Sequence, residues 1–123
     1  MTAHKDPKGS ASFPVPLFLG RVRVCITRDA YNQSHQFFEG LPYKYVKDVQ
    51  GVSSKHLHKD GTVYLVGIFS GGDGTLVHEL VHTATSILAH SAVPFTAKND
   101  EALAYLMDSL FVASKEAIKR ARR

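Results

Sequence analysis

Two histidines four residues apart are the feature that most constrains this chain, because they can act together only if they lie on a helix. His78 and His82 have this spacing, and Glu79 follows the first of them. In an α-helix, residues i and i+4 lie one above the other on the same face, so both imidazoles can point at one spot. Two histidines in this geometry bind Zn²⁺, and a neighbouring carboxylate acts on a metal-bound water. The spacing therefore predicts a helical zinc site with Glu79 beside it.

The residues around this motif favour the required helix. Apolar side chains recur at helical spacing and predict its buried stripe, which comprises Val77, Leu80, Val81, Ala84, Ile87 and Leu88. The centre of that stripe lies more than a quarter-turn from His78 and His82, so we expect the histidines to flank the core. A glycine-rich start over residues 71–75 offers Asp73 or Thr75 as the N-cap.

A second helix is predicted after a proline-containing turn. Asn99 or Asp100 can cap this helix, which we expect to run to about Arg120. Its apolar seam comprises Leu103, Leu106, Met107, Leu110 and Ala113 or Ser114. Packing this seam against the first stripe would make a helical hairpin.

One carboxylate of this second helix is a candidate metal ligand. Glu101 lies in the first turn, on a face that continues through Tyr105 and Asp108. The hairpin could bring Glu101 opposite the two histidines, which would give the His₂Glu set of a catalytic zinc site. Tyr105 and Asp108 would then lie close to the metal ligands and could orient them.

The motif His78-Glu79-Leu80-Val81-His82, with Glu101 after eighteen intervening residues, resembles the gluzincin clan of zinc metallopeptidases. Residues 74–82 and 99–106 are similar to small phage or prophage proteins of that type and to single-domain minigluzincins. The resemblance covers about residues 62–111 and implies a zincin-like core with a motif helix and a glutamate helix. It implies Zn²⁺ as the cofactor, with two histidines and Glu101 as ligands. It also implies Glu79 as the general base.

The resemblance implies a metallopeptidase that hydrolyses peptide bonds with a metal-activated water, encoded by a phage or prophage. The alternative is a catalytically inactive, zinc-binding phage accessory or virion-associated protein that acts by binding. A third interpretation has no metal, with the two histidines as polar residues beside the core. The chain has Tyr105 where thermolysin-like proteins have Asp, and it lacks their large second domain. In such folds a strand at the sheet edge binds extended substrate, which here would lie between residues 43 and 69.

The remaining sequence predicts an α+β fold, with a small mixed β-sheet packed on helices. Residues 1–16 contain two late prolines and read as a flexible N-terminal arm, and residues 17–123 read as a single zincin-like domain. Strands are expected at residues 17–27, 43–49, 52–57 and 62–69, and a helix capped by Asp29 at residues 30–38. The sequence Lys59-Asp60-Gly61 predicts a hairpin turn.

Several single residues carry further expectations. His56 and His58 are expected on one exposed face of the hairpin, and His90 at a helix C-terminus, where its charge suits the dipole. Cys25 is expected to be a buried, inert thiol. Three tyrosines could polarise a tetrahedral oxyanion, Tyr43, Tyr64 and Tyr105, and we favour Tyr105.

The composition of the chain limits which partners and which cellular locations we expect. No apolar run is long enough for a membrane span, and no signal peptide follows Met1, so we expect the host cytoplasm or the virion. The single cysteine excludes an intrachain disulfide, which fits a reducing compartment. The basic tail at residues 115–123 suggests a solvated helix end, and no nucleic-acid-binding motif accompanies it. The expected partners are a peptide or protein substrate and phage virion proteins.

Overall fold

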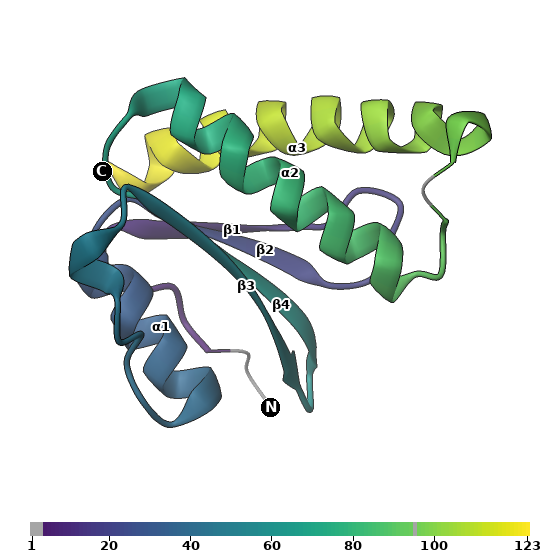
Figure 1. Ribbon diagram of the computed structural model, residues 1–123. Helices are drawn as coiled ribbons and strands as arrows, with labels where there is room; N and C mark the ends of the chain where they lie inside the picture. Colours follow the sequence, from purple (N-terminus) through teal and green to yellow (C-terminus); the bar gives the residue numbers. More distant parts are fainter. Residues whose placement is uncertain (1–3, 95) are drawn as a thin grey trace.

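The computed structural model describes residues 4–94 and 96–123, which form one β-sheet with helices on both faces (Figure 1). The strands are β1 (Ser10–Pro14), β2 (Arg21–Cys25), β3 (Gly51–His58) and β4 (Gly61–Ile68); the helices are α1 (Arg28–Glu39), α2 (Gly72–His90) and α3 (Asp100–Ala121). Short 3-10 turns occupy Val46–Asp48 and Ala97–Asn99. α2 and α3 cover one face of the sheet, and α1 lies against the other (Figure 1). The expected α+β class with a small mixed sheet is confirmed.

The sheet has the strand order β1-β2-β4-β3. β2 and β4 run parallel in its centre, whereas β1 and β3 are antiparallel to their neighbours. The long apolar strand expected at residues 62–69 is β4, and its Leu65 and Val66 are fully buried because both faces are covered. Lys59 and Asp60 form the predicted hairpin turn between β3 and β4. β3 is an edge strand of the sheet and lies beside α2.

The first strand corrects the predicted N-terminal arm. Residues 10–14 of that arm form β1, and Ala11, Phe13 and Val15 are buried in the core under α3. The prolines that suggested an arm lie at the end of an edge strand and just after it, where a missing N–H is tolerated. The arm prediction is therefore wrong for this part, and residues 1–3 lie outside the described residues.

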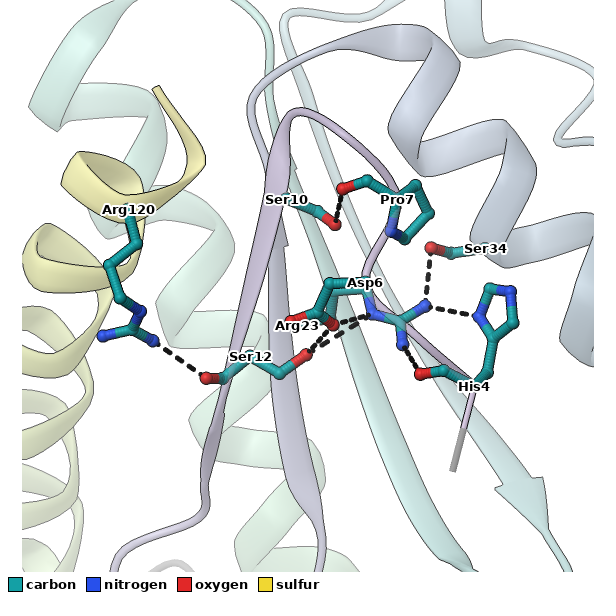
Figure 2. A network of polar contacts seen from close by, with 8 residues as sticks. All are labelled: His4, Asp6, Pro7, Ser10, Ser12, Arg23, Ser34 and Arg120. Carbon is teal, nitrogen blue, oxygen red and sulfur yellow. Dashed lines mark hydrogen bonds and ion pairs between the residues drawn. The ribbon is translucent and has the colours of Figure 1, made fainter. Parts of the chain in front are cut away.

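A buried arginine holds the segment that precedes β1. Arg23 is only 4% exposed, and its guanidinium contacts polar atoms of His4, Asp6, Ser12 and Ser34 (Figure 2). Its Nε donates to Asp6 Oδ1 at 2.9 Å, Nη1 to Ser34 Oγ at 2.8 Å, and Nη2 to the His4 carbonyl at 2.8 Å. Since a buried charge needs partners, the network ties the N-terminal segment and α1 to β2.

The basic tail forms the last turns of α3 and packs on the domain. Lys115 Nζ lies 2.9 Å from Asp73 Oδ1 at the start of α2. Arg120 Nη2 donates to the Ser12 carbonyl of β1 at 2.9 Å (Figure 2). These cations bridge the C-terminal helix to two other elements.

The buried face of α2 differs in part from the expected stripe. Six of its apolar or small residues are buried against the sheet and α3, namely Leu76, Leu80, Thr83, Ala84, Ile87 and Leu88. Val77 and Val81 remain 42% and 44% exposed, contrary to the prediction. The stripe is rotated towards β3 because the helix packs on the sheet as well as on α3.

Two local predictions before β3 are also wrong. Residues 43–49 form an irregular segment with one 3-10 turn, Val46–Asp48, and no strand. α1 is capped by Thr27, whose Oγ1 accepts from the Ala30 N–H at 3.1 Å, and Asp29 lies in its first turn. The helix ends as predicted at Gly40, whose φ of 83° suits glycine.

Candidate metal centre

The two histidines of the motif lie one turn apart on the solvent side of α2. The centroids of their rings are 5.0 Å apart, and the side chain of His78 is 69% exposed. His82 is exposed as well, so neither residue flanks the core as expected. The structure does bring the two imidazoles together, as their spacing predicts.

Glu79 leaves α2 on a different side, towards β3, and is only 7% exposed. Its Oε2 lies 4.0 Å from Nε2 of His78, which is too long for a hydrogen bond. Burying a carboxylate costs free energy unless a cation or a donor compensates its charge. The Glu79 carboxylate is therefore a candidate contact for a bound cation.

A glycine on β3 makes room for this carboxylate. A Cβ atom at Gly51 would lie 3.0 Å from Glu79 Cγ and 2.5 Å from Thr75 Cγ2. The distance to Thr75 is shorter than real Cβ contacts and the distance to Glu79 is tight, so a larger residue requires the Thr75 side chain or β3 to shift. Gly51 thus permits the close approach of the edge strand to the motif helix.

A groove of ≈ 480 Å³ runs between β3 and α2 at this point. Its walls are Gly51, Val52, Ser53, Ser54, Lys55, Tyr64, Glu79, His82, Thr83 and Ser86. Glu79 and His82 of the motif therefore both face a space that a ligand can enter. The β3 residues along the opposite wall belong to the strand at the edge of the sheet.

Tyr64 of β4 contributes an unusual group to the groove. The residue is 1% exposed, and within the described part of the chain its hydroxyl has no hydrogen-bond partner. Burial raises the pKa of Tyr64 above its ordinary value, so the hydroxyl keeps its proton and remains a donor. A buried donor without an acceptor is rare, and Tyr64 is among the residues around the groove that Glu79 also lines.

The backbone of β3 offers further hydrogen-bonding groups. The Phe69 N–H donates to the Gln50 carbonyl at 2.8 Å, at the position that extends the β3–β4 register by one pair. Hydrogen-bonded pairs alternate along an antiparallel ladder, so the even-numbered residues of β3 bond to β4. The N–H and C=O groups of Gly51, Ser53 and Lys55 therefore point to the free edge.

The remaining predicted site residues lie on α3. Glu101, Tyr105 and Asp108 share its exposed face, and Tyr105 is 66% exposed. The buried residues Leu106 and Leu110 occupy the opposite face. Within residues 4–94 and 96–123, no three His, Cys, Asp or Glu side chains form a metal-binding group. The structure thus groups the motif residues of α2 without adding Glu101 to them.

Sequence reasoning missed a buried chain of polar side chains between α1 and β3. His56 is 3% exposed, contrary to the prediction of an exposed hairpin residue. Its Nε2 lies 2.6 Å from Ser54 Oγ, and its Nδ1 lies 2.6 Å from Glu39 Oε2. Tyr31 Oη is 2.6 Å from the same serine oxygen. A signal existed in the sequence, because residues two apart on a strand share a face, and Ser54 precedes His56 at that spacing.

Two further expectations concern Cys25 and His90. Cys25 is fully buried, and burial raises the pKa of its thiol to about 12, so the prediction of an inert thiol is confirmed. His90 is the last residue of α2, as expected for a cation at a helix C-terminus.

Comparison of the chain with protein-family models, with curated proteins and with solved structures found no match. Among the described residues, no helix has the length and hydrophobicity needed to cross a membrane.

Proposed function

We propose that this chain is a zinc-dependent hydrolase of peptide bonds whose zincin-like core consists of α2, α3 and the sheet. The observation that carries the proposal is the position of Glu79, a buried carboxylate in a groove between the two-histidine helix and the free edge of β3. A motif formed by chance would need neither the groove nor the glycine that opens it. Its origin in a phage or prophage stays a prediction from the resemblance.

Two histidines supply part of a zinc donor set, and no third His, Cys, Asp or Glu side chain of the described residues joins them. Imidazole nitrogens are preferred zinc ligands, and His78 and His82 present two of them on one exposed face. Glu101 is our candidate for the third ligand, since it lies in the first turn of the helix that follows α2. Bound zinc would make a water molecule nucleophilic near neutral pH and polarise a carbonyl group.

The chain's own residues would supply the proton transfers and the remaining polarisation. Glu79 would accept a proton from the attacking water and deliver it to the leaving amine, the role of a general base and then a general acid. Tyr64 would donate its unpaired hydroxyl to the carbonyl oxygen of the substrate as negative charge develops there. Tyr64 thus replaces Tyr105 as our candidate, because Tyr64 lines the groove and Tyr105 faces solvent.

The substrate that fits the groove best is an extended peptide. The free-edge backbone groups of Gly51, Ser53 and Lys55 could pair with it as an added strand. Such pairing would bring the scissile bond past Glu79 without requiring a particular side chain. Lys55 is the one cation among the groove residues and would favour an acidic substrate residue at its position.

Cleavage of a peptide library tests the proposal. The wild-type chain loaded with zinc should cleave some sequences, and Glu79→Gln should lose that cleavage while it retains zinc. Tyr64→Phe should lower turnover by about 100- to 1,000-fold, whereas Tyr105→Phe should cleave like the wild type. Cleavage by Glu79→Gln at the wild-type rate would refute the assignment of the base.

The exposed position of Glu101 favours a second candidate, a zinc-binding protein that does not hydrolyse peptides. A site with two histidine ligands leaves positions that a partner, such as a virion protein, could fill. Zinc binding without cleavage of any library peptide, together with stable association with a capsid or tail protein, would support this candidate.

A further inference from the structure

The polar chain between α1 and β3 has the connectivity of a nucleophile, a base and an orienting carboxylate. Ser54 Oγ lies 2.6 Å from Nε2 of His56, and Nδ1 of His56 lies 2.6 Å from Oε2 of Glu39. The serine and the histidine come from β3, and the glutamate is the last residue of α1. Both distances are within hydrogen-bond reach, and His56 contacts its two partners through different ring nitrogens. The catalytic triads of serine hydrolases have the same connectivity.

The chemistry of the four groups fixes the direction of these hydrogen bonds. The hydrogen bond from His56 lowers the pKa of Glu39, so the carboxylate is ionised at neutral pH and can only accept. Burial lowers the pKa of His56, which leaves a neutral ring with its proton on Nδ1 and a free lone pair on Nε2. Ser54 must then donate its proton to that lone pair.

The fourth group is Tyr31, whose hydroxyl lies 2.6 Å from Ser54 Oγ. Since the serine proton is directed at the histidine, the tyrosine must be the donor in this contact. Burial raises the pKa of Tyr31, which keeps that donor protonated. One lone pair of the serine oxygen is thereby engaged and the other is left for an electrophile.

We propose that Ser54 is a second nucleophile of this protein, activated by His56 and Glu39, which reacts with activated acyl and phosphonyl esters. Its oxygen would form a bond to the ester carbonyl carbon while the proton passes to His56 Nε2. The bond to the leaving alcohol then breaks, and the alcohol takes the proton from His56. Water would then give a proton to His56 Nε2 and bond to the acyl carbon. The bond to Ser54 breaks, the serine oxygen takes the proton from His56, and the carboxylic acid leaves. This reaction needs no metal and goes beyond the proposed peptidase activity.

Part of Ser54 is open to solvent. Its hydroxyl lies with Tyr31 and His56 on the face of β3 that packs against α1, so an ester would approach from that face at the free edge of the strand, and not from the groove beside α2. The free-edge N–H groups of Ser53 and Lys55 flank it in sequence and point away from β4, so they are available to an oxyanion. The carboxylate side chain of Glu39 is 43% exposed, which allows its substitution without opening the core.

Labelling with a fluorophosphonate probe, followed by peptide mass spectrometry, tests the proposal. The Ser54 oxygen would bond to phosphorus, fluoride would leave, and the proton would pass to His56. We expect one adduct on Ser54, lost in Ser54→Ala and retained in Ser109→Ala, whose serine is exposed on α3. Absence of an adduct on Ser54 in the folded wild-type protein would overturn the proposal.

Three variants separate activation from simple exposure. His56→Asn should slow labelling by about 100-fold or more, the usual contribution of a general base, and Glu39→Gln should slow it as well. Tyr31→Phe should speed labelling, because it frees a lone pair of the serine oxygen. Equal rates in Glu39→Gln and the wild type, with both folded by circular dichroism, would overturn the role of the carboxylate. Labelling of Ser54 should persist in His82→Ala and in the presence of a metal chelator. The labelling experiment therefore tests the Ser54 proposal independently of the zinc proposal.

Discussion

Replacing Gly51 with alanine tests how closely the edge strand approaches the motif helix. The added Cβ would lie 2.5 Å from Thr75 Cγ2, 3.0 Å from Glu79 Cγ and 3.0 Å from the Gly67 carbonyl oxygen. Ordinary van der Waals contact begins near 3.4 Å, so the Thr75 and Glu79 side chains, together with β3, must shift by up to about 1 Å. Overpacking of this kind destabilises a domain by about 1–3 kcal/mol.

The same displacement would move Glu79 relative to a bound peptide. A misplacement of about 1 Å in a reacting group can cost roughly 100-fold in rate. We therefore expect Gly51→Ala to lower both the free energy of unfolding, measured in urea, and the rate of peptide cleavage. Zinc content should stay unchanged, because Gly51→Ala removes neither histidine ligand.

Gly74→Ala is the matched control on α2. A Cβ at Gly74 would meet nothing within 4 Å, and alanine is the better helix former, so this variant should gain about 0.5–1 kcal/mol. Its cleavage rate should equal that of the wild type. Wild-type stability and cleavage in Gly51→Ala would refute the close packing of β3 on the motif helix.

Three further predictions concern stability. Asp6→Ala should cost about 1–3 kcal/mol in urea unfolding, because it leaves the buried Arg23 guanidinium without its carboxylate; an unchanged midpoint would contradict the network. Burial lowers the pKa of His56 in the folded protein, so the unfolded chain binds a proton at this residue more readily. The contribution of neutral His56 to the free energy of unfolding is therefore present above pH 6.5 and is lost as the pH falls through the folded-state pKa. His56→Gln should remove this part of the pH dependence of urea unfolding. Leu80→Ala should cost about 2–5 kcal/mol and Val81→Ala less than about 0.5 kcal/mol, and equal costs would contradict the rotated buried stripe of α2.

The helices and the β3–β4 hairpin could be predicted because their signals are local. Helical spacing of apolar residues located α2 and α3, and the Lys59-Asp60-Gly61 turn located the hairpin. The pairing of the two imidazoles follows from the i, i+4 spacing alone. Such features depend on residues close together in the sequence.

The features that were missed depend on contacts between distant segments. β1 is a strand because β2 lies beside it and α3 covers it, and its own sequence contains prolines that argue against a strand. His56 is buried because α1 packs over β3, which brings Glu39 to its ring. The exposure of Val81 depends on how α2 rotates on the sheet, which the apolar pattern leaves open.

The candidate site shows the same division. The sequence identified Glu79 and both histidines, but the groove exists only because β3 is an edge strand and Gly51 lets it approach α2. Tyr64 is favoured over Tyr105 because β4 carries it into the lining of this groove, a position that depends on the packing of α2 on the sheet.

The central claim is tested most directly by the zinc content of the purified chain. Elemental mass spectrometry would measure it in the wild type and in the variants His82→Ala and Glu101→Ala. The account predicts about one zinc per chain in the wild type and in Glu79→Gln, with loss in His82→Ala and in Glu101→Ala. Zinc retained in Glu101→Ala would assign the third ligand to another group. No zinc in the wild type, even after reconstitution with the metal, would contradict the account.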